Sequence, residues 1–128
     1  MRALLDTHTF LWLNSEPERI PVGVRGLIED AANQIFFSAV AAWEISVKYA
    51  KGHLDLPIPA EDYVLTRIGR ERFQPLAIEV SHALHAGHLP PIHNDPFDRL
   101  LVSQAQLERL PLLTSDANIA RYDVEVIW

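Results

Sequence analysis

The chain has 128 residues, of which 48% are hydrophobic, no cysteine, and a formal net charge of −6 at pH 7. This length fits a single domain, residues 1–128, that buries its core without disulfides or a structural metal. The lack of cysteine excludes disulfide frameworks and thiolate metal sites. The acidic balance argues against a broad electrostatic surface for duplex nucleic acid. Because no export signal or membrane-length apolar run is present, we expect a soluble, cytoplasmic protein.

Short apolar strands alternate with amphipathic helices along the chain. Strands are expected at 3–5, 35–37, 76–78, 112–114 and 124–127. Helices are expected at 7–13, 21–32, from a Ser38 cap to Gly52, 60–68, from Ser81 to just before Pro90, and after an Asp95 cap. This order predicts the α/β class, as a three-layer α/β/α sandwich with a short parallel sheet. Sites in such folds form at the carboxyl ends of the strands.

Two aspartates directly follow predicted strands. Asp6 ends the strand at 3–5, and Asp116 comes shortly after the strand at 112–114, ahead of a short helix. Taken alone, each has a simpler interpretation as a helix N-cap, because aspartate is favoured at that position. Neither residue by itself indicates a functional site.

Glu44 lies inside the helix that Ser38 is expected to cap, among apolar neighbours. A capping-box partner of Ser38 would be residue 41, which is alanine, so Glu44 does not serve as one. The remaining simple interpretation is an exposed ion pair with Lys48, which would stabilise the helix by about 0.2–0.5 kcal/mol. Since helical side chains tilt toward the N-terminus, Glu44 can lean back toward the edge of the sheet.

Asp95 and Asp98 flank the start of the next long helix. Pro96 suits the first helical position, which makes Asp95 the N-cap and Asp98 the third helical residue. Capping explains Asp95 well. It explains Asp98 less well, because glutamate or glutamine normally occupies that third position.

Asp6, Glu44, Asp98 and Asp116 are therefore persuasive only as a set. Carboxylates gathered at one sheet edge would repel one another by about 4 kcal/mol per pair at ~4 Å and an effective dielectric constant of 20. We expect a cation to compensate this repulsion, and oxygen ligands without thiolate favour Mg²⁺ or Mn²⁺ over zinc.

Several ordered motifs resemble the PIN-domain family and, more narrowly, the VapC-type toxins of bacterial toxin–antitoxin pairs. The resemblance extends from Leu4 to Trp128, and one small departure is His53, where many relatives carry lysine. The motifs are Leu4-Leu5-Asp6-Thr7-His8 with Leu11-Trp12, Trp43-Glu44-Ile45 with Lys48 and Gly52, His93 with Asp95-Pro96-Phe97-Asp98-Arg99-Leu100-Leu101, and Leu113-Thr114-Ser115-Asp116.

The resemblance implies a PIN-like α/β/α fold and an endoribonuclease that uses Mg²⁺ or Mn²⁺. The family's acids carry over to Asp6, Glu44, Asp98 and Asp116, and Ser38 and Thr114 match polar positions beside the site. It further implies a homodimer and a short antitoxin that covers the active site. Contact with operator DNA would occur only through that antitoxin, and no membrane is involved.

In the expected mechanism, Asp6, Asp98 and Asp116 hold one or two ions, and Glu44 binds through water or orients the attacking water. Arg99 and Lys48 are candidates to contact substrate phosphate. Their simpler roles are to neutralise the neighbouring acids or to face solvent.

Other interpretations are weaker. His82, His85, His88 and His93 lack a zinc motif, and Trp12, Trp43 and Phe97 are expected in the core or a dimer interface. A haloacid-dehalogenase-like phosphatase needs an aspartate at position 8, which is histidine here, and a receiver domain needs adjacent acids that are absent. The main alternative is a catalytically silent PIN-like module that binds RNA or a protein partner, which loss of an acid would indicate.

Overall fold

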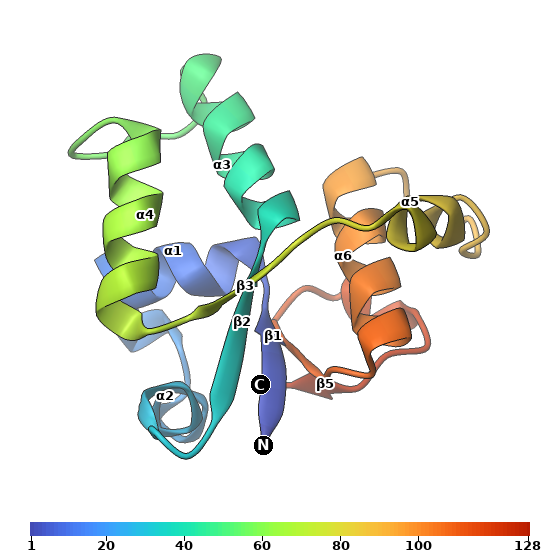
Figure 1. The fold of residues 1–128 in the computed structure, drawn as a ribbon, viewed down its shortest axis with the longest axis horizontal. Helices are drawn as coiled ribbons and strands as arrows, with labels where there is room; N and C mark the ends of the chain where they lie inside the picture. The colour runs from blue at the N-terminus through green and yellow to red at the C-terminus, as the bar shows by residue number, and fades with distance from the viewer.

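A computed structural model describes residues 1–128 and contains a five-stranded parallel sheet (Figure 1). The strand order is β3-β2-β1-β4-β5, so β1 lies at the centre between β2 and β4. The register places Leu4 opposite Phe36 on one side and Leu112 on the other. The strands are β1 (Arg2–Leu5), β2 (Gln34–Ser38), β3 (Gln74–Leu76), β4 (Leu112–Leu113) and β5 (Val126–Ile127).

Helices cover both faces of this sheet, which confirms the predicted three-layer α/β/α architecture. In Figure 1, α1, α2 and α4 lie on one side of the strands, and α5 and α6 lie on the other. The α-helices are α1 (Thr7–Ser15), α2 (Val22–Glu29), α3 (Ala39–Ala50), α4 (Ala60–Glu71), α5 (Val80–Ala86) and α6 (Pro96–Glu108), with 3₁₀ helices η1 (Pro17–Arg19) and η2 (Ile119–Arg121).

The alternation of side chains along each strand produces two separate cores. Leu5 of β1 and Leu113 of β4 join the larger cluster beneath α1, α2 and α4. Their neighbours Leu4 and Leu112 join the smaller cluster beneath α6. Successive residues of a strand point to opposite faces, so each strand contributes to both cores.

Helix α3 follows β2 directly and contacts α1, α4 and α6, which places it across the carboxyl end of the sheet. The Ser38 hydroxyl caps it by accepting the Val40 backbone N–H at 2.9 Å. After the helix, Gly52 adopts φ +73°, a left-handed conformation that favours glycine. Both boundary residues were predicted from the sequence.

Several boundaries differ from the sequence predictions. The second helix ends at Glu29 and not near residue 32, the fourth extends to Glu71 and not 68, and the last strand is Val126–Ile127 and not 124–127. The third strand is Gln74–Leu76 and not 76–78, so Leu76 closes the strand that the apolar run was expected to open. Pro75 is tolerated there because β3 is an edge strand, where a missing N–H costs little. The fifth helix begins at Val80, with Glu79 as its cap instead of Ser81. None of the helices is long and apolar enough to span a bilayer.

Candidate active site

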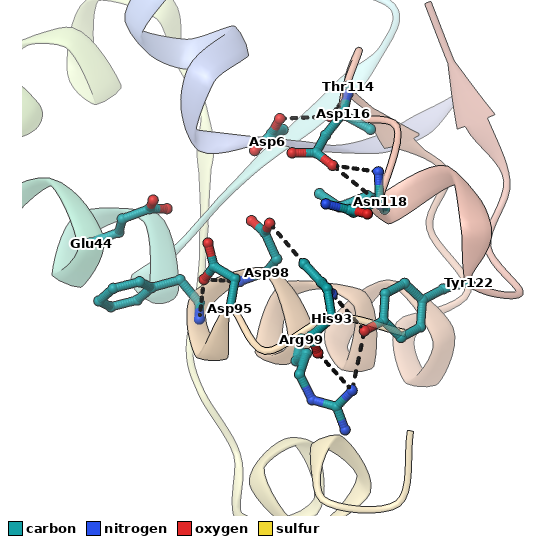
Figure 2. A network of polar contacts seen from close by, with 12 residues as sticks. Asp6, Glu44, His93, Asp95, Asp98, Arg99, Thr114, Asp116, Asn118 and Tyr122 are labelled. Carbon is teal, nitrogen blue, oxygen red and sulfur yellow. Dashed lines mark hydrogen bonds and ion pairs between the residues drawn. The ribbon is translucent and has the colours of Figure 1, made fainter. Parts of the chain in front are cut away.

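Asp6 and Thr114 come from neighbouring strands and meet at the carboxyl edge of the sheet. Asp6 follows β1, is 3% exposed, and occupies the N-cap position of α1 without using its side chain as a cap. Its Oδ2 instead accepts a hydrogen bond from the Thr114 hydroxyl at 2.6 Å (Figure 2). The capping interpretation therefore does not account for the Asp6 carboxylate.

Asp116 stands beside Asp6 on the segment that follows β4. Its backbone N–H donates to the Thr114 hydroxyl oxygen at 3.0 Å, so Thr114 connects both acids. The Asp116 Oδ1 accepts the backbone N–H groups of Asn118 and Ile119, at 2.8 and 3.1 Å. The Asp116 side chain thus accepts backbone N–H groups at the start of a short helix, as the N-cap interpretation predicted, although the N-cap residue of η2 is Asn118. Figure 2 shows its carboxylate beside that of Asp6.

Glu44 approaches from α3, on the other side of the same space (Figure 2). It is 3% exposed, so the ion pair that it forms with Lys48 at 2.5 Å is not the exposed pair considered from the sequence. Burial lowers the pKa of the Lys48 ammonium. The hydrogen bond and charge of Glu44, and the charges of Asp95 and Asp98, outweigh this effect and raise the pKa. Lys48 therefore stays charged beside the acids.

Asp98 projects from the first turn of α6 toward Asp6 and Asp116 (Figure 2). Asp95 is the N-cap, as predicted, because its Oδ1 accepts the backbone N–H groups of Phe97 and Asp98 at 2.9 and 3.2 Å. Asp98 is therefore free of capping, and its Oδ2 lies 3.1 Å from His93 Nε2.

The electrostatics show that these carboxyl groups act on one another. The pKa of Asp98 is raised to about 6: burial is the largest cause, the His93 hydrogen bond opposes it, and the charges of Asp95, Asp6 and Asp116 add to it. Burial also raises the pKa of Asp6, against Thr114 and His8, with help from Asp116 and Glu44. Such mutual repulsion is typical of carboxylates that share a cation.

The donor chemistry fits a hard divalent cation, although the acids do not close around one in this conformation. Every candidate ligand is a carboxylate oxygen, which is the donor that Mg²⁺ and Mn²⁺ prefer. No group of three or more His, Asp or Glu side chains is close enough to enclose an ion. The acids face a common space, and their free oxygens would have to draw together to bind a metal.

Of the four residues expected to contact substrate, two touch the acids and two do not. Ser38 is fully buried, and its hydroxyl bonds to Gln104 Oε1 as well as capping α3. The Arg99 guanidinium points away from the acids in Figure 2 and donates to backbone carbonyls and to Tyr122. Lys48 and Thr114 are the two that touch the acids directly.

The four histidines that suggested a zinc site do not lie close together and have separate partners. His82 completes the capping box of α5, where its Nδ1 accepts the Glu79 N–H, and its Nε2 lies 2.9 Å from Glu108 Oε1. His85 pairs with Gln106. His88 Nδ1 lies 2.9 Å from the Leu84 carbonyl oxygen. Of the set, only His93 reaches an acid of the site.

Two residues beside the acids were not predicted from the sequence: Tyr122, which contacts His93, and His8, which lines two hollows. Tyr122 lies 2.7 Å from His93 but 29 residues away in the chain, so no local motif links them. His8 lines two hollows beside the acids, of about 510 and 230 Å³. Trp12 lines both hollows with it, Glu44 and Lys48 border the larger, and Asp6 and Asp116 border the smaller. Trp43 is half exposed and lies edge-on to Phe97.

A parallel α/β/α sandwich with acids at the carboxyl edge of its central strands defines the PIN class of fold. The family model of the PIN domain matches residues 3–125, and the chain therefore belongs to the PIN-domain family.

One relative is Ribonuclease VapC16 of Mycobacterium tuberculosis, which is 38% identical over 61 residues. The match covers 48% of this chain and 43% of that relative, so it spans less than half of either protein.

Solved structures support the same fold. The VapBC2 structure from Rickettsia felis, bound to a DNA fragment from its promoter, superposes with a TM-score of 0.72 at 16% identity, covering 99% of this chain and 98% of that one. DNA-bound VapBC from Salmonella typhimurium also gives 0.72 at 16% identity, covering 99% and 97%. FitAcB from Neisseria gonorrhoeae gives 0.67 at 20% identity, covering 100% and 97%.

Proposed function

We propose that this chain is a Mg²⁺- or Mn²⁺-dependent endoribonuclease that acts as the toxin of a toxin–antitoxin pair. One observation carries the proposal: the carboxylates of Asp6, Glu44, Asp98 and Asp116 face one space at the carboxyl edge of the sheet. Burial, with the charges of neighbouring acids, raises the pKa of Asp6 and Asp98. Membership of the PIN-domain family and the similarity to Ribonuclease VapC16 support it.

Each acid has a proposed role. Asp6, Asp98 and Asp116 hold one or two cations, since their carboxylates face one another at the sheet edge. Glu44 binds through water or orients the attacking water. When bound, the cation lowers the pKa of water and stabilises the charge that develops on the phosphodiester. Water would displace the 3′ oxygen in line, which would leave a 5′ phosphate on one fragment and a 3′ hydroxyl on the other, the leaving oxygen taking up a proton.

The basic residues have separate proposed roles. Lys48 neutralises Glu44 in the substrate-free protein and is 40% exposed at its side chain, so it can also contact a phosphate. Thr114 and Ser38 hold their neighbours in place and do not themselves need to touch RNA. Arg99 donates to Tyr122 and to backbone carbonyls, so its proposed role is to hold these groups and not to contact phosphate.

The proposed partners follow the related complexes. We propose a homodimer, a cognate antitoxin that covers the acids, and contact with operator DNA through that antitoxin only, because the similar VapBC structures hold DNA. The proposed location is the cytoplasm, where RNA is available.

The test is cleavage of a defined RNA by purified protein, with mapping of the new ends. We expect cleavage with Mg²⁺ or Mn²⁺, 5′-phosphate ends, and loss of activity in EDTA and in Asp98→Asn. The matched control is Asp62→Asn, an exposed acid in the first turn of α4, which should cleave normally. Equal cleavage in EDTA, or full activity of Asp98→Asn, would contradict the proposal.

The silent-module alternative makes a different prediction in cells. If the chain arrests bacterial growth by cutting RNA, Asp6→Ala relieves the arrest while the protein still accumulates. If it acts by sequestering RNA or a partner, arrest persists in Asp6→Ala. All four acids are present and face one another, which favours the nuclease.

A further inference from the structure

A continuous row of hydrogen bonds leads from Arg99 to Asp98 through two other side chains (Figure 2). Arg99 Nη1 lies 3.1 Å from the Tyr122 hydroxyl oxygen. That oxygen lies 2.7 Å from His93 Nδ1, and His93 Nε2 lies 3.1 Å from Asp98 Oδ2. We call these four residues the Arg99–Asp98 relay.

The direction of the relay follows from its first member. A guanidinium has only donors, so the Tyr122 oxygen accepts from Arg99. The Tyr122 O–H then donates a hydrogen bond to His93 Nδ1, which accepts it. A ring whose Nδ1 accepts carries its proton on Nε2, and this N–H donates to the Asp98 carboxylate. Of the two partners of the Tyr122 hydroxyl, only His93 can accept, because Arg99 has donors alone.

The Arg99 guanidinium is held by several further hydrogen bonds. It also donates to the backbone carbonyls of Ala86, Leu89 and Pro90, at 3.2, 3.1 and 2.8 Å. These carbonyls belong to the end of α5 and the loop after it. The planar, multidentate guanidinium therefore fixes the loop and the start of the relay together, which a lysine could not do.

Tyr122 reaches the relay on the segment that Asp116 begins. The Asp116 side chain accepts the first N–H groups of the η2 turn, and Tyr122 closes that turn through its N–H to the Ile119 carbonyl. The side chain of Tyr122 is 4% exposed. The segment from Asp116 to Tyr122 thus supplies both an acid of the site and the buried hydroxyl of the relay.

The relay leaves Asp98 with two unequal oxygens. Oδ2 is occupied by the His93 N–H, whereas the other oxygen makes no hydrogen bond within the protein. Carboxylates that bind metals are commonly held by such a partner, which fixes the orientation of the ligand.

We propose that Tyr122, oriented by Arg99, holds His93 as its Nε2–H tautomer. His93 and Tyr122 are then positioning residues that direct the free Asp98 oxygen toward the divalent cation. The part that concerns the cation rests on the proposed function. The position of the proton rests on the hydrogen bonds alone.

The test compares Tyr122→Phe with the wild type. The ¹⁵N shifts of the His93 ring report its tautomer, and calorimetry with Mn²⁺ alone reports the dissociation constant. We expect a single Nε2–H tautomer in the wild type and its loss in Tyr122→Phe, with Mn²⁺ binding weakened about 10-fold or more. The matched control is Tyr63→Phe, which removes another buried phenol hydroxyl from α4, packed against Phe10, and should change neither value.

A second pair of variants separates positioning from folding. His93→Gln keeps an N–H donor for Asp98 and should retain most of the Mn²⁺ affinity, whereas His93→Leu should lose it at similar thermal stability. Unchanged His93 shifts in Tyr122→Phe would overturn the relay. Unchanged Mn²⁺ affinity with an altered tautomer would overturn its positioning role. If the wild type binds no Mn²⁺, the proposed function fails, and the tautomer result alone decides the relay.

Discussion

Thr114 is the residue on which two acids depend at once. Its hydroxyl donates to Asp6 Oδ2 and accepts the Asp116 N–H, and the side chain is fully buried. Because a buried hydrogen-bond partner left unsatisfied costs about 1–3 kcal/mol, we expect Thr114→Val to lower the free energy of unfolding by that amount. We also expect weaker Mn²⁺ binding. Urea denaturation and calorimetry measure the two effects.

A nearby threonine supplies the control. Thr9 is also fully buried, and its hydroxyl donates to the Leu113 carbonyl at 2.8 Å without touching an acid. Thr9→Val should therefore destabilise the fold while leaving Mn²⁺ affinity unchanged. Equal losses of affinity in both variants would show that Thr114 acts through general stability and not through Asp6.

The raised pKa of Asp98, about 6, predicts how stability depends on pH without metal. The folded protein binds this proton more tightly than the unfolded chain, whose Asp has a pKa near 3.8. The contribution of Asp98 to stability is therefore complete below about pH 4 and is lost as the pH rises through about 6. Asp6 has the same sign, because its pKa is also raised.

Melting temperatures in EDTA at pH 4 to 8 measure this dependence. We expect the wild type to lose stability across pH 4 to 6 relative to Asp98→Asn, whose curve lacks this component. Added Mn²⁺ should restore stability at neutral pH only where Asp98 is present. Parallel curves for the wild type and Asp98→Asn would contradict the shared electrostatics of the acids. Asp62→Asn should keep the wild-type slope.

The functional role of the four acids stays a prediction from the sequence, and the contacts among them could not be predicted from it. Asp6, Glu44, Asp98 and Asp116 were found from their positions after strands, within a helix and by resemblance. The contacts that hold them join residues far apart in the chain, such as Thr114 and Asp6 at a separation of 108 residues. Arg99 was expected near phosphate because it follows Asp98, yet neighbouring helical residues face different directions.

At the scale of elements, the cap of α6 determines where Asp98 points. The Asp95 side chain accepts two backbone N–H groups, one of which belongs to Asp98 itself. We expect Asp95→Ala to lower the free energy of unfolding by about 0.5–2 kcal/mol, as measured by urea denaturation. Asp95→Ser removes the same charge but keeps a capping oxygen, so it should recover most of the loss. Equal stability of the two variants would argue against the cap.

Three helix boundaries that carry a capping signal were predicted correctly, whereas the N-cap of α5 at Glu79 was not, although Glu79 forms a capping box. Ser38, Gly52 and Asp95 have the predicted roles because each provides a local hydrogen bond or backbone conformation. The third strand was placed two residues too late, because the apolar run at 76–78 outweighed Gln74 and Pro75. An edge strand is defined by its pairing with β2, which local composition does not encode.

At the scale of the whole molecule, the sheet separates two cores that should respond independently to mutation. Ile28 of α2 packs in the larger core, and Leu101 of α6 packs in the smaller. We expect Ile28→Val to cost about 0.5–1.5 kcal/mol and Leu101→Ala about 2–5 kcal/mol. Because they share no neighbours, the double variant should be additive within about 0.5 kcal/mol in denaturation experiments. A larger coupling energy would contradict the separation of the cores.

The alternation of strands and helices sufficed to predict a covered parallel sheet, but it did not fix the order β3-β2-β1-β4-β5. That order depends on which crossovers pair β1 with both β2 and β4, and these are long-range contacts. The order matters for the site, because it brings the ends of β1 and β4 together and thus Asp6 beside Thr114 and Asp116.

The bond between Thr114 and Asp6 has a consequence for synthesis of the protein. Asp6 emerges from the ribosome early, but its partners on β4 and the following segment emerge after residue 111. Since chains begin to fold from the N-terminus while they are made, most of the helices can form before the acid set is complete. On the proposed function, the acid set would be incomplete in the nascent chain, and activity would begin only after β4 and the segment that follows it have left the ribosome.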